Sequence, residues 1–339
     1  MIIDIMRLVL FSTLFFLSTA SYSSCETMRL DQKNGAMERI PVYDQGNLNV
    51  CYGYAVSQII DAYRFSHGEE DFDHLTSPVA VSVFYSVGKD KDSVEFGNTR
   101  DAIPTVLKNG SCKYGSVFKK IGNIDYEDYF EELEDSYDDF KALGKRSLFR
   151  LFSPKTSEEV VNNILELVHD KRASESVLGA HEVLSALDSP TYLVFLKRLF
   201  GVLCNDSQKD LKLSVTQHSK FARDFNSQSR TENLIESIHM AWDTKHPQPV
   251  GISYCEDFLY NKDHVGIDDE GKVSSRCRTH HASVVIGRRP SKDGKNCQFL
   301  IRNSKGDSCS NYEWDCENGQ IWVDQKALGR NIYYTTWLE

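Results

Sequence analysis

The chain has 339 residues, of which 40% are apolar and 26% are charged. This composition is typical of a globular protein with one large core or two ordinary ones, and it excludes an intrinsically disordered chain. The formal net charge of −10 argues against a nucleic-acid partner and against an anionic membrane surface, since both require a basic field.

The first 24 residues have the pattern of an export signal. Arg7 precedes an apolar run over 8–20, and small residues follow it. This run is shorter than the roughly 20 residues that a membrane-spanning helix needs. We therefore expect 1–24 to be a signal peptide and the mature chain to be secreted or periplasmic, without a transmembrane span. A lipid anchor on Cys25 is the less favoured alternative.

Nine cysteines in an exported chain indicate a disulfide framework. If Cys51 is a free thiol, the other eight permit four bridges, provided that Cys25 is retained. The count does not determine the pairing. Only two local pairs are expected: Cys255 with Cys277, and Cys309 with Cys316.

The stretch from Ile40 to Arg64 changes from a polar turn into a helix at Cys51. Apolar residues then recur at the spacing of a helix with one buried face: Tyr52, Ala55, Val56, Ile59, Ile60 and Tyr63. Cys51 is thus expected in the first turn, where free backbone N–H groups and the helix dipole favour a thiolate. Gln45 lies close enough in the chain to donate to an oxyanion beside that sulfur. Alternatively, Cys51 is a small core residue or one half of a disulfide.

The middle of the chain is predicted to be helical. An apolar stretch at 78–87 and a helix at 101–108, ended by Asn109-Gly110, come first. Nine acidic residues then fall within 125–139, and helices are expected as far as about 230. Thr156 and Glu159 form a capping box, and Ser189-Pro190 opens a later helix. We expect the acidic run to be a solvated helix face rather than a Ca²⁺ site or a docking site for a basic partner.

After an amphipathic helix at 233–242, the pattern changes to short strands. These are expected at 250–254, 282–286, 297–302 and 320–323. The turn-rich stretch 288–296 predicts a hairpin loop, and pairing about its centre places His281 opposite Asn303. An imidazole held by an amide is oriented to act as a base toward a thiol. His280 is the alternative base, because a register slip of one residue exchanges the two.

Four segments, in this order, resemble the papain-like cysteine peptidases: DQGNLNVCYGYA at 44–55, THHASVVIGR at 279–288, RNSKG at 302–306 and ENGQIWV at 317–323. The resemblance implies that Gln45 is the oxyanion donor, Cys51 the nucleophile, His281 the general base and then acid, and Asn303 the group that orients His281. It also implies an α+β fold with a helical lobe, an antiparallel β-barrel-like lobe and a cleft for a peptide or protein substrate between them. No cofactor and no metal are expected.

This resemblance divides the chain into a helical lobe at 25–124, a helical insertion at 125–230 and a β-rich lobe at 231–339. Only a short stretch separates the signal from Pro41, so the family's long inhibitory propeptide is not expected. We expect the insertion to cover or narrow the cleft in its place. Docking of a protein partner is the alternative role for the insertion.

Three positions depart from the family pattern. Leu48 stands where the family usually has a cysteine, and Tyr52 where it has a tryptophan. Lys305 replaces the tryptophan that shields the asparagine–histidine contact. We expect Lys305 to leave Asn303 more solvated and to hold the ring of His281 less firmly.

Three functions fit these residues. The preferred one is an exported peptidase that hydrolyses peptide bonds through a thioester acyl-enzyme. The others are a weak or inactive binding protein on a papain-like fold, and a thiol acyl-transferase or amidase acting on another amide. Retention of all four catalytic residue types favours an enzyme. Its specificity pocket is expected near 96–98, Ser253 and Ala282.

Overall fold

The fold is described from a computed structural model. The described residues are 25–89, 93–117, 126–144, 156–168, 178–205, 208–209, 215–227 and 229–339. The predicted signal peptide at 1–24 lies outside them. Within the described residues, no helix is both long and apolar enough to cross a bilayer.

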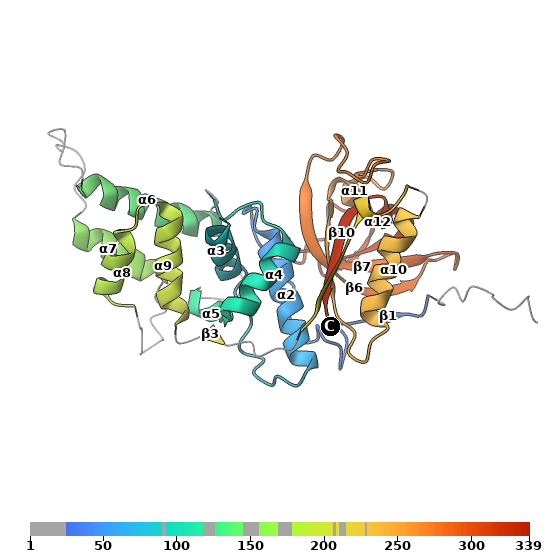
Figure 1. The fold of residues 1–339 in the computed structure, drawn as a ribbon, viewed down its shortest axis with the longest axis horizontal. Coiled ribbons are helices and arrows are strands. Elements are labelled where there is room, and N and C mark those ends of the chain that lie inside the picture. Colours follow the sequence, from blue (N-terminus) through green and yellow to red (C-terminus); the bar gives the residue numbers. More distant parts are fainter. Residues whose placement is uncertain are drawn as a thin grey trace, which may run out of the picture.

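The helix that begins at Cys51 lies between the other helices and the sheet (Figure 1). It is α2 (Cys51–Ser66), followed by α3 (Pro78–Gly88), α4 (Thr99–Asn109) and α5 (Tyr114–Val117). Residues 52–64 are all buried, because α2 packs against α3, α4 and the sheet. The helix ends follow the sequence signals: the Ser77 side chain caps α3, and Gly110, with a φ of 83°, ends α4. The helices predicted in this part are confirmed.

A buried charged pair on α2 fixes the loop that leads into α3. The carboxylate of Asp61 accepts hydrogen bonds from Arg64 Nη1 at 2.8 Å, from Thr76 N at 2.8 Å and from Thr76 Oγ1 at 2.6 Å. Burial raises the pKa of Asp61 to about 6, although the Arg64 charge and the Thr76 hydrogen bonds act to lower it. Removing either charge would leave the other buried without its partner.

Helices α6 (Tyr126–Gly144), α7 (Ser157–Val168), α8 (Ala180–Leu187) and α9 (Tyr192–Cys204) form the end of the molecule farthest from the sheet (Figure 1). The predicted capping box opens α7: Thr156 N donates to the Glu159 carboxylate, and Glu159 N donates to Thr156 Oγ1. On α6, Leu133 and Tyr137 are buried while the described acidic residues face solvent or are half-buried. The expectation of a solvated acidic helix face is therefore confirmed for these residues.

The helices of the predicted insertion, α6 to α9, do not cover the junction of α2 with the sheet. Helix α9 packs against α3 and α5, and the other three helices pack on one another and on α9, on the side of α3 away from the sheet (Figure 1). A disulfide joins Cys204, at the end of α9, to Cys112 in β2 (Ser111–Cys112). Strand β2 also pairs with β3 (Gln208–Lys209), which follows α9. The expectation that the insertion narrows the cleft is wrong for these helices, because their apolar faces are buried against each other and α3.

The rest of the chain builds one antiparallel sheet. Its strands are β1 (Met28–Arg29), β4 (Gln217–Phe221), β5 (Val250–Cys255), β6 (His280–Pro290), β7 (Cys297–Arg302), β8 (Asp315–Glu317), β9 (Gln320–Asp324) and β10 (Ile332–Leu338). The strand order is β4-β10-β5-β6-β7-β9-β8, and β1 pairs with β6. Helices α10 (Arg230–Trp242) and α12 (Gln325–Gly329) pack together beside this sheet, and α11 (Asp257–Tyr260) follows β5.

The predicted α+β fold is confirmed, as are the four predicted strands and the helix at 233–242. The sequence did not predict β4 or β10. Strand β4 lies inside the range 125–230 that was expected to be helical, and it pairs with β10 along its whole length. The sheet therefore begins before residue 231.

The predicted register of the β6–β7 hairpin is wrong. Val284 pairs with Arg302, so the ladder does not place His281 directly opposite Asn303. The strands run further into the expected loop, where Pro290 pairs with Cys297, and an irregularity between Val285 and Gly287 shifts the pairing. Between the start of β6 and this irregularity, the observed pairing differs from the predicted one by two positions. Because side chains alternate between faces, His281 and Asn303 still lie on the same face of the sheet, as diagonal neighbours.

All nine cysteines lie within the described residues. Four disulfides join Cys25 to Cys297, Cys112 to Cys204, Cys255 to Cys277 and Cys309 to Cys316, and Cys51 is free. Both predicted local pairs are confirmed. The bond to Cys297 occupies the sulfur of Cys25, which argues against the alternative of a lipid anchor there.

Candidate active site

Cys51 is the first residue of α2 and is half-buried. No side chain caps this helix end, since Val50 occupies the N-cap. No side-chain acceptor therefore competes at this end of the helix, where the helix dipole favours a negative charge. This is the position that the sequence predicted, and it favours a thiolate.

His281 lies at the start of β6 and is buried, and its ring is fixed by Asn303. The Nε2 atom of His281 is 2.6 Å from Oδ1 of Asn303. That oxygen also accepts a hydrogen bond from Ser304 N at 2.8 Å and one from Ser283 Oγ at 3.2 Å, which identifies it as the acceptor end of the amide. Nε2 must therefore carry the hydrogen, and Nδ1 is left to interact with the thiol.

The thiol and the imidazole form a coupled pair. Burial alone would raise the pKa of the Cys51 thiol, but the charge of His281, a hydrogen bond to its ring and one to the Ala282 backbone outweigh it, so this pKa is lowered. Burial alone would lower the pKa of His281. The charges of Cys51 and Glu256, with hydrogen bonds to Cys51 and Asn303, instead raise it to about 9. Both shifts favour a thiolate beside an imidazolium.

The side-chain amide of Gln45 is fixed at both ends. Its Nε2 donates to Leu48 O at 2.6 Å, and its Oε1 accepts from Ser304 Oγ at 2.6 Å. A backbone carbonyl can only accept, so this network settles which end is nitrogen and leaves one N–H of Gln45 unused by Leu48. Gln45 N also donates to Ser304 O at 2.9 Å, which joins the Gln45 turn to the segment that carries Asn303.

The contact between Asn303 and His281 is shielded despite Lys305. Asn303 is fully buried, and its Nδ2 donates to Tyr312 Oη at 3.1 Å. The ring of Tyr312 stacks on Tyr260 with centroids 5.6 Å apart. Lys305 instead donates to Gly46 O at 3.2 Å. The expectation of a more solvated Asn303 is wrong, because Tyr312, nine residues along the chain, covers the amide.

The structure separates His281 from the alternative, His280. The side chain of His280 is exposed, and its Nδ1 lies 3.1 Å from the hydroxyl of Tyr333. Among the residues expected near a specificity pocket, Phe96 is 73% exposed, whereas Ser253 and Ala282 are buried and pair with each other across β5 and β6.

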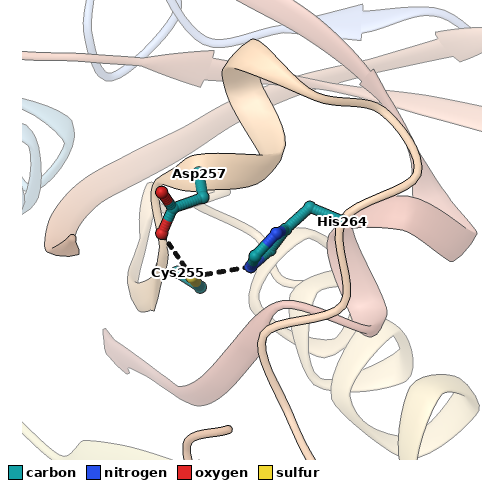
Figure 2. A group of neighbouring side chains, drawn as sticks. All are labelled: Cys255, Asp257 and His264. Carbon is teal, nitrogen blue, oxygen red and sulfur yellow. Dashed lines mark hydrogen bonds between the residues drawn. The ribbon is translucent and has the colours of Figure 1, made fainter. Parts of the chain in front are cut away.

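Cys255, Asp257 and His264 are close enough together to suggest a metal site (Figure 2). The sulfur of Cys255 lies 3.3 Å from His264 Nε2 and 3.1 Å from Asp257 Oδ2. However, this sulfur is bonded to Cys277, and a disulfide sulfur is not the thiolate that a metal requires. The group is therefore part of the surroundings of a disulfide.

No family model and no curated protein matches the chain. Among solved structures, the chain is similar to SERA5E from Plasmodium falciparum, with a TM-score of 0.48 and 12% identity over 93% of this chain and 96% of that one. It is similar to xylellain, a cysteine protease from Xylella fastidiosa, with a TM-score of 0.44 and 14% identity over 92% and 85%. It is also similar to the digestive procathepsin L2 proteinase of Tenebrio molitor, with a TM-score of 0.46 and 14% identity over 94% and 69%.

The expected α+β arrangement, with helices packed on an antiparallel sheet, is confirmed by the elements of the chain itself. A helix beginning at Cys51 packs on an antiparallel sheet, and the strands of that sheet place His281 and Asn303 beside its first turn.

Sequence reasoning missed Glu256, Ser304 and Tyr312. Each acts on a predicted site residue: Glu256 on His281, Ser304 on Gln45, and Tyr312 on Asn303. Ser304 is 259 residues from Gln45 in the chain, so no spacing pattern could have linked them.

Proposed function

We propose that the protein is an exported cysteine peptidase that hydrolyses peptide bonds with Cys51, His281, Asn303 and Gln45. The observation that carries this proposal is the free thiol of Cys51 at the start of α2, whose pKa the charge of His281 lowers, together with His281 Nε2 held 2.6 Å from Asn303 Oδ1. This is the arrangement of nucleophile, base and orienting group. The disulfide framework supports an oxidising, extracytoplasmic location.

In the proposed reaction the thiolate of Cys51 attacks the peptide carbonyl carbon and forms a C–S bond. The carbonyl oxygen becomes an oxyanion, stabilised by the backbone N–H of Cys51 and the free N–H of Gln45. His281 then gives its Nδ1 proton to the amine as the C–N bond breaks, which leaves a thioester. Water, deprotonated by His281, hydrolyses this thioester and releases the carboxylic acid and the thiolate.

Labelling with a thiol-directed epoxide tests the nucleophile. The mature chain is incubated with the epoxide and weighed by mass spectrometry. We expect one label on Cys51, none on Cys51→Ala, and slow labelling of His281→Ala. His280→Ala is the matched control, and we expect it to label as the wild type does. A folded wild type that does not label would contradict the proposal and favour a binding protein.

A substrate panel tests the reaction. Fluorogenic peptides are compared with cell-wall amides, each at fixed concentration with wild type and Cys51→Ala. Hydrolysis of peptides that is lost in Cys51→Ala supports the peptidase. If Cys51 reacts with the epoxide but the protein hydrolyses only the cell-wall amides, the result would instead indicate an amidase.

A further inference from the structure

Glu256 is a buried carboxylate beside the imidazole that the proposed reaction does not use. It follows β5 directly and is 4% exposed. Its Oε1 lies 3.9 Å from His281 Nε2, the same nitrogen that contacts Asn303. Tyr260 Oη donates to this oxygen at 3.3 Å. In the part of the chain that the structure describes, His281 is its only basic partner within 4.0 Å.

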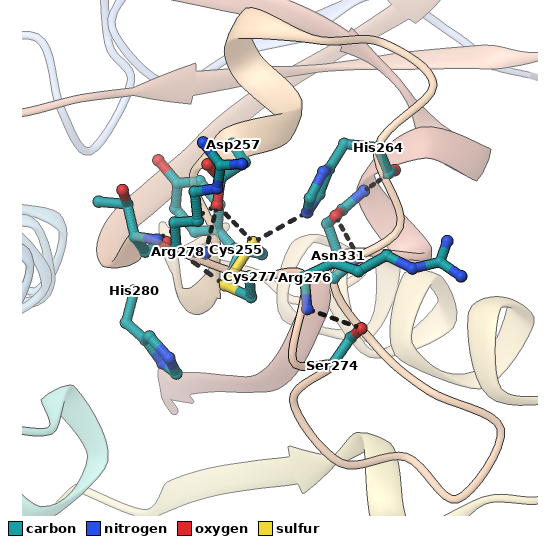
Figure 3. Close-up of a disulfide and its surroundings, with 12 residues drawn as sticks. Cys255, Asp257, His264, Ser274, Arg276, Cys277, Arg278, His280 and Asn331 are labelled. Carbon is teal, nitrogen blue, oxygen red and sulfur yellow. Dashed lines mark hydrogen bonds between the residues drawn. A yellow bond between two sulfur atoms is a disulfide. The ribbon is translucent and has the colours of Figure 1, made fainter.

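A clamp around the disulfide between Cys255 and Cys277 holds the backbone of Glu256 in place relative to the strand that carries His281. Figure 3 shows this disulfide with Asp257 and Arg278 beside it. Glu256 N donates to Thr279 O at 2.9 Å, and the next residue, Asp257, accepts from Arg278 N at 2.8 Å and from Thr279 N at 3.2 Å through Oδ2. The disulfide from Cys255 to Cys277 joins the same two segments covalently. The backbone of Glu256 is therefore fixed relative to the segment that leads into His281.

A carboxylate so far from water favours a positive charge on its neighbour. Removing a carboxylate from water is costly unless it is paired, and a protonated His281 provides the missing partner. The titratable groups next to His281 are the thiol of Cys51 on α2, Glu256, and the tyrosines Tyr254 and Tyr333. Tyr260 and Tyr312 contact Glu256 and Asn303 instead. Glu256 is the only carboxylate among the groups next to His281.

We propose that Glu256 is a positioning residue that holds His281 in the imidazolium form and so keeps the thiolate–imidazolium pair of Cys51 and His281 stable toward higher pH. This inference rests on the proposed function, but it concerns the pair rather than the substrate. The effect of Glu256 agrees in direction with the pKa of His281, which the carboxylate helps to raise. The same charge acts to raise the pKa of Cys51, although more weakly than His281 lowers it.

The test is the pH profile of Glu256→Gln, which keeps the size of the side chain and removes its charge. The rate of Cys51 alkylation by iodoacetamide is measured from pH 4 to 10, with peptide hydrolysis in parallel. We expect the alkaline transition, which reports His281, to fall by about 1 to 3 pH units. The acid transition, which reports Cys51, should also move to lower pH. Glu270→Gln, at an exposed carboxylate that pairs with Lys272, should match the wild type.

Profiles of folded Glu256→Gln that superimpose on those of the wild type would overturn the inference. If this variant does not fold, Glu256→Asp is used instead, because it keeps the charge but moves the carboxylate away from the His281 ring by one methylene. A lowered alkaline transition in that variant supports the proposal, and an unchanged one overturns it. If alkylation of the wild type shows the two transitions of the Cys51–His281 pair but no peptide is hydrolysed, the proposed peptidase function is refuted. The role of Glu256 is then decided by the alkylation profiles alone.

Discussion

Ser304→Ala separates positioning of Gln45, the proposed oxyanion donor, from activation of the thiol. Ser304 Oγ donates to Gln45 Oε1 at 2.6 Å, and both residues are buried at 2% exposure. Removing the hydroxyl leaves the carbonyl end of the Gln45 amide without this donor, while the bond from Gln45 Nε2 to Leu48 O remains. The amide is then held at one end only.

The size of the effect follows from this geometry. An unsatisfied buried acceptor costs about 1–3 kcal/mol, and loss of a whole oxyanion donor costs about 10²- to 10³-fold in kcat. Because the donor of Gln45 is loosened but not removed, we expect kcat to fall by roughly 5- to 30-fold, which corresponds to about 1–2 kcal/mol. Alkylation of Cys51 by iodoacetamide forms no oxyanion, so its rate should stay within about twofold of wild type.

A double-mutant cycle makes the reasoning refutable. In a Gln45→Ala background, Ser304→Ala should lower kcat no further, since the group it positions is absent. Ser310→Ala, at an exposed hydroxyl, is the matched control. A proportional loss of alkylation and kcat in Ser304→Ala would show that Ser304 acts through Asn303 and the imidazole instead. Additive losses in the cycle would refute the link to Gln45.

Three further predictions follow from buried groups and from the coupled pair. Asp61→Asn leaves the buried guanidinium of Arg64 without its carboxylate, and urea denaturation should show a loss of about 3–5 kcal/mol in the free energy of unfolding. Tyr312→Ala uncovers Asn303, and we expect kcat to fall roughly tenfold with little change in KM. Because the pKa of Cys51 is lowered, its alkylation rate should begin to rise below the ordinary thiol range, reach a plateau, and rise again near pH 9, where the imidazolium loses its proton.

Each of these predictions has a contrary outcome. Asp73→Asn, at an exposed carboxylate, should leave the free energy of unfolding unchanged, and an equal loss in both variants would contradict the role of the buried pair. Unaltered kcat in Tyr312→Ala would show that another group shields the amide. A single alkylation transition near pH 8.5 would mean that Cys51 titrates as an isolated thiol.

The register of the β6–β7 hairpin shows where prediction from sequence fails. The sequence predicted the strand at 297–302 with both ends correct, yet it started the loop three residues too early, at 288 instead of 291, and misaligned the pair. Turn residues mark where a chain is able to reverse, whereas the pairing that forms depends on which side chains fit the core. The contact between His281 and Asn303 survived this error because a shift of two positions preserves the face.

The sequence by itself determined the local features of this protein. Capping residues and apolar periodicity fixed α2, α3, α4 and α7, and they put Cys51 at a helix start, because these signals act over a few residues. Only the tertiary structure decided that Tyr312 would shield Asn303, that Glu256 would face the imidazole, and that α6–α9 would lie away from the sheet. Those outcomes depend on packing between segments distant in the chain, and packing is selected by the shape of the whole core rather than by any local pattern.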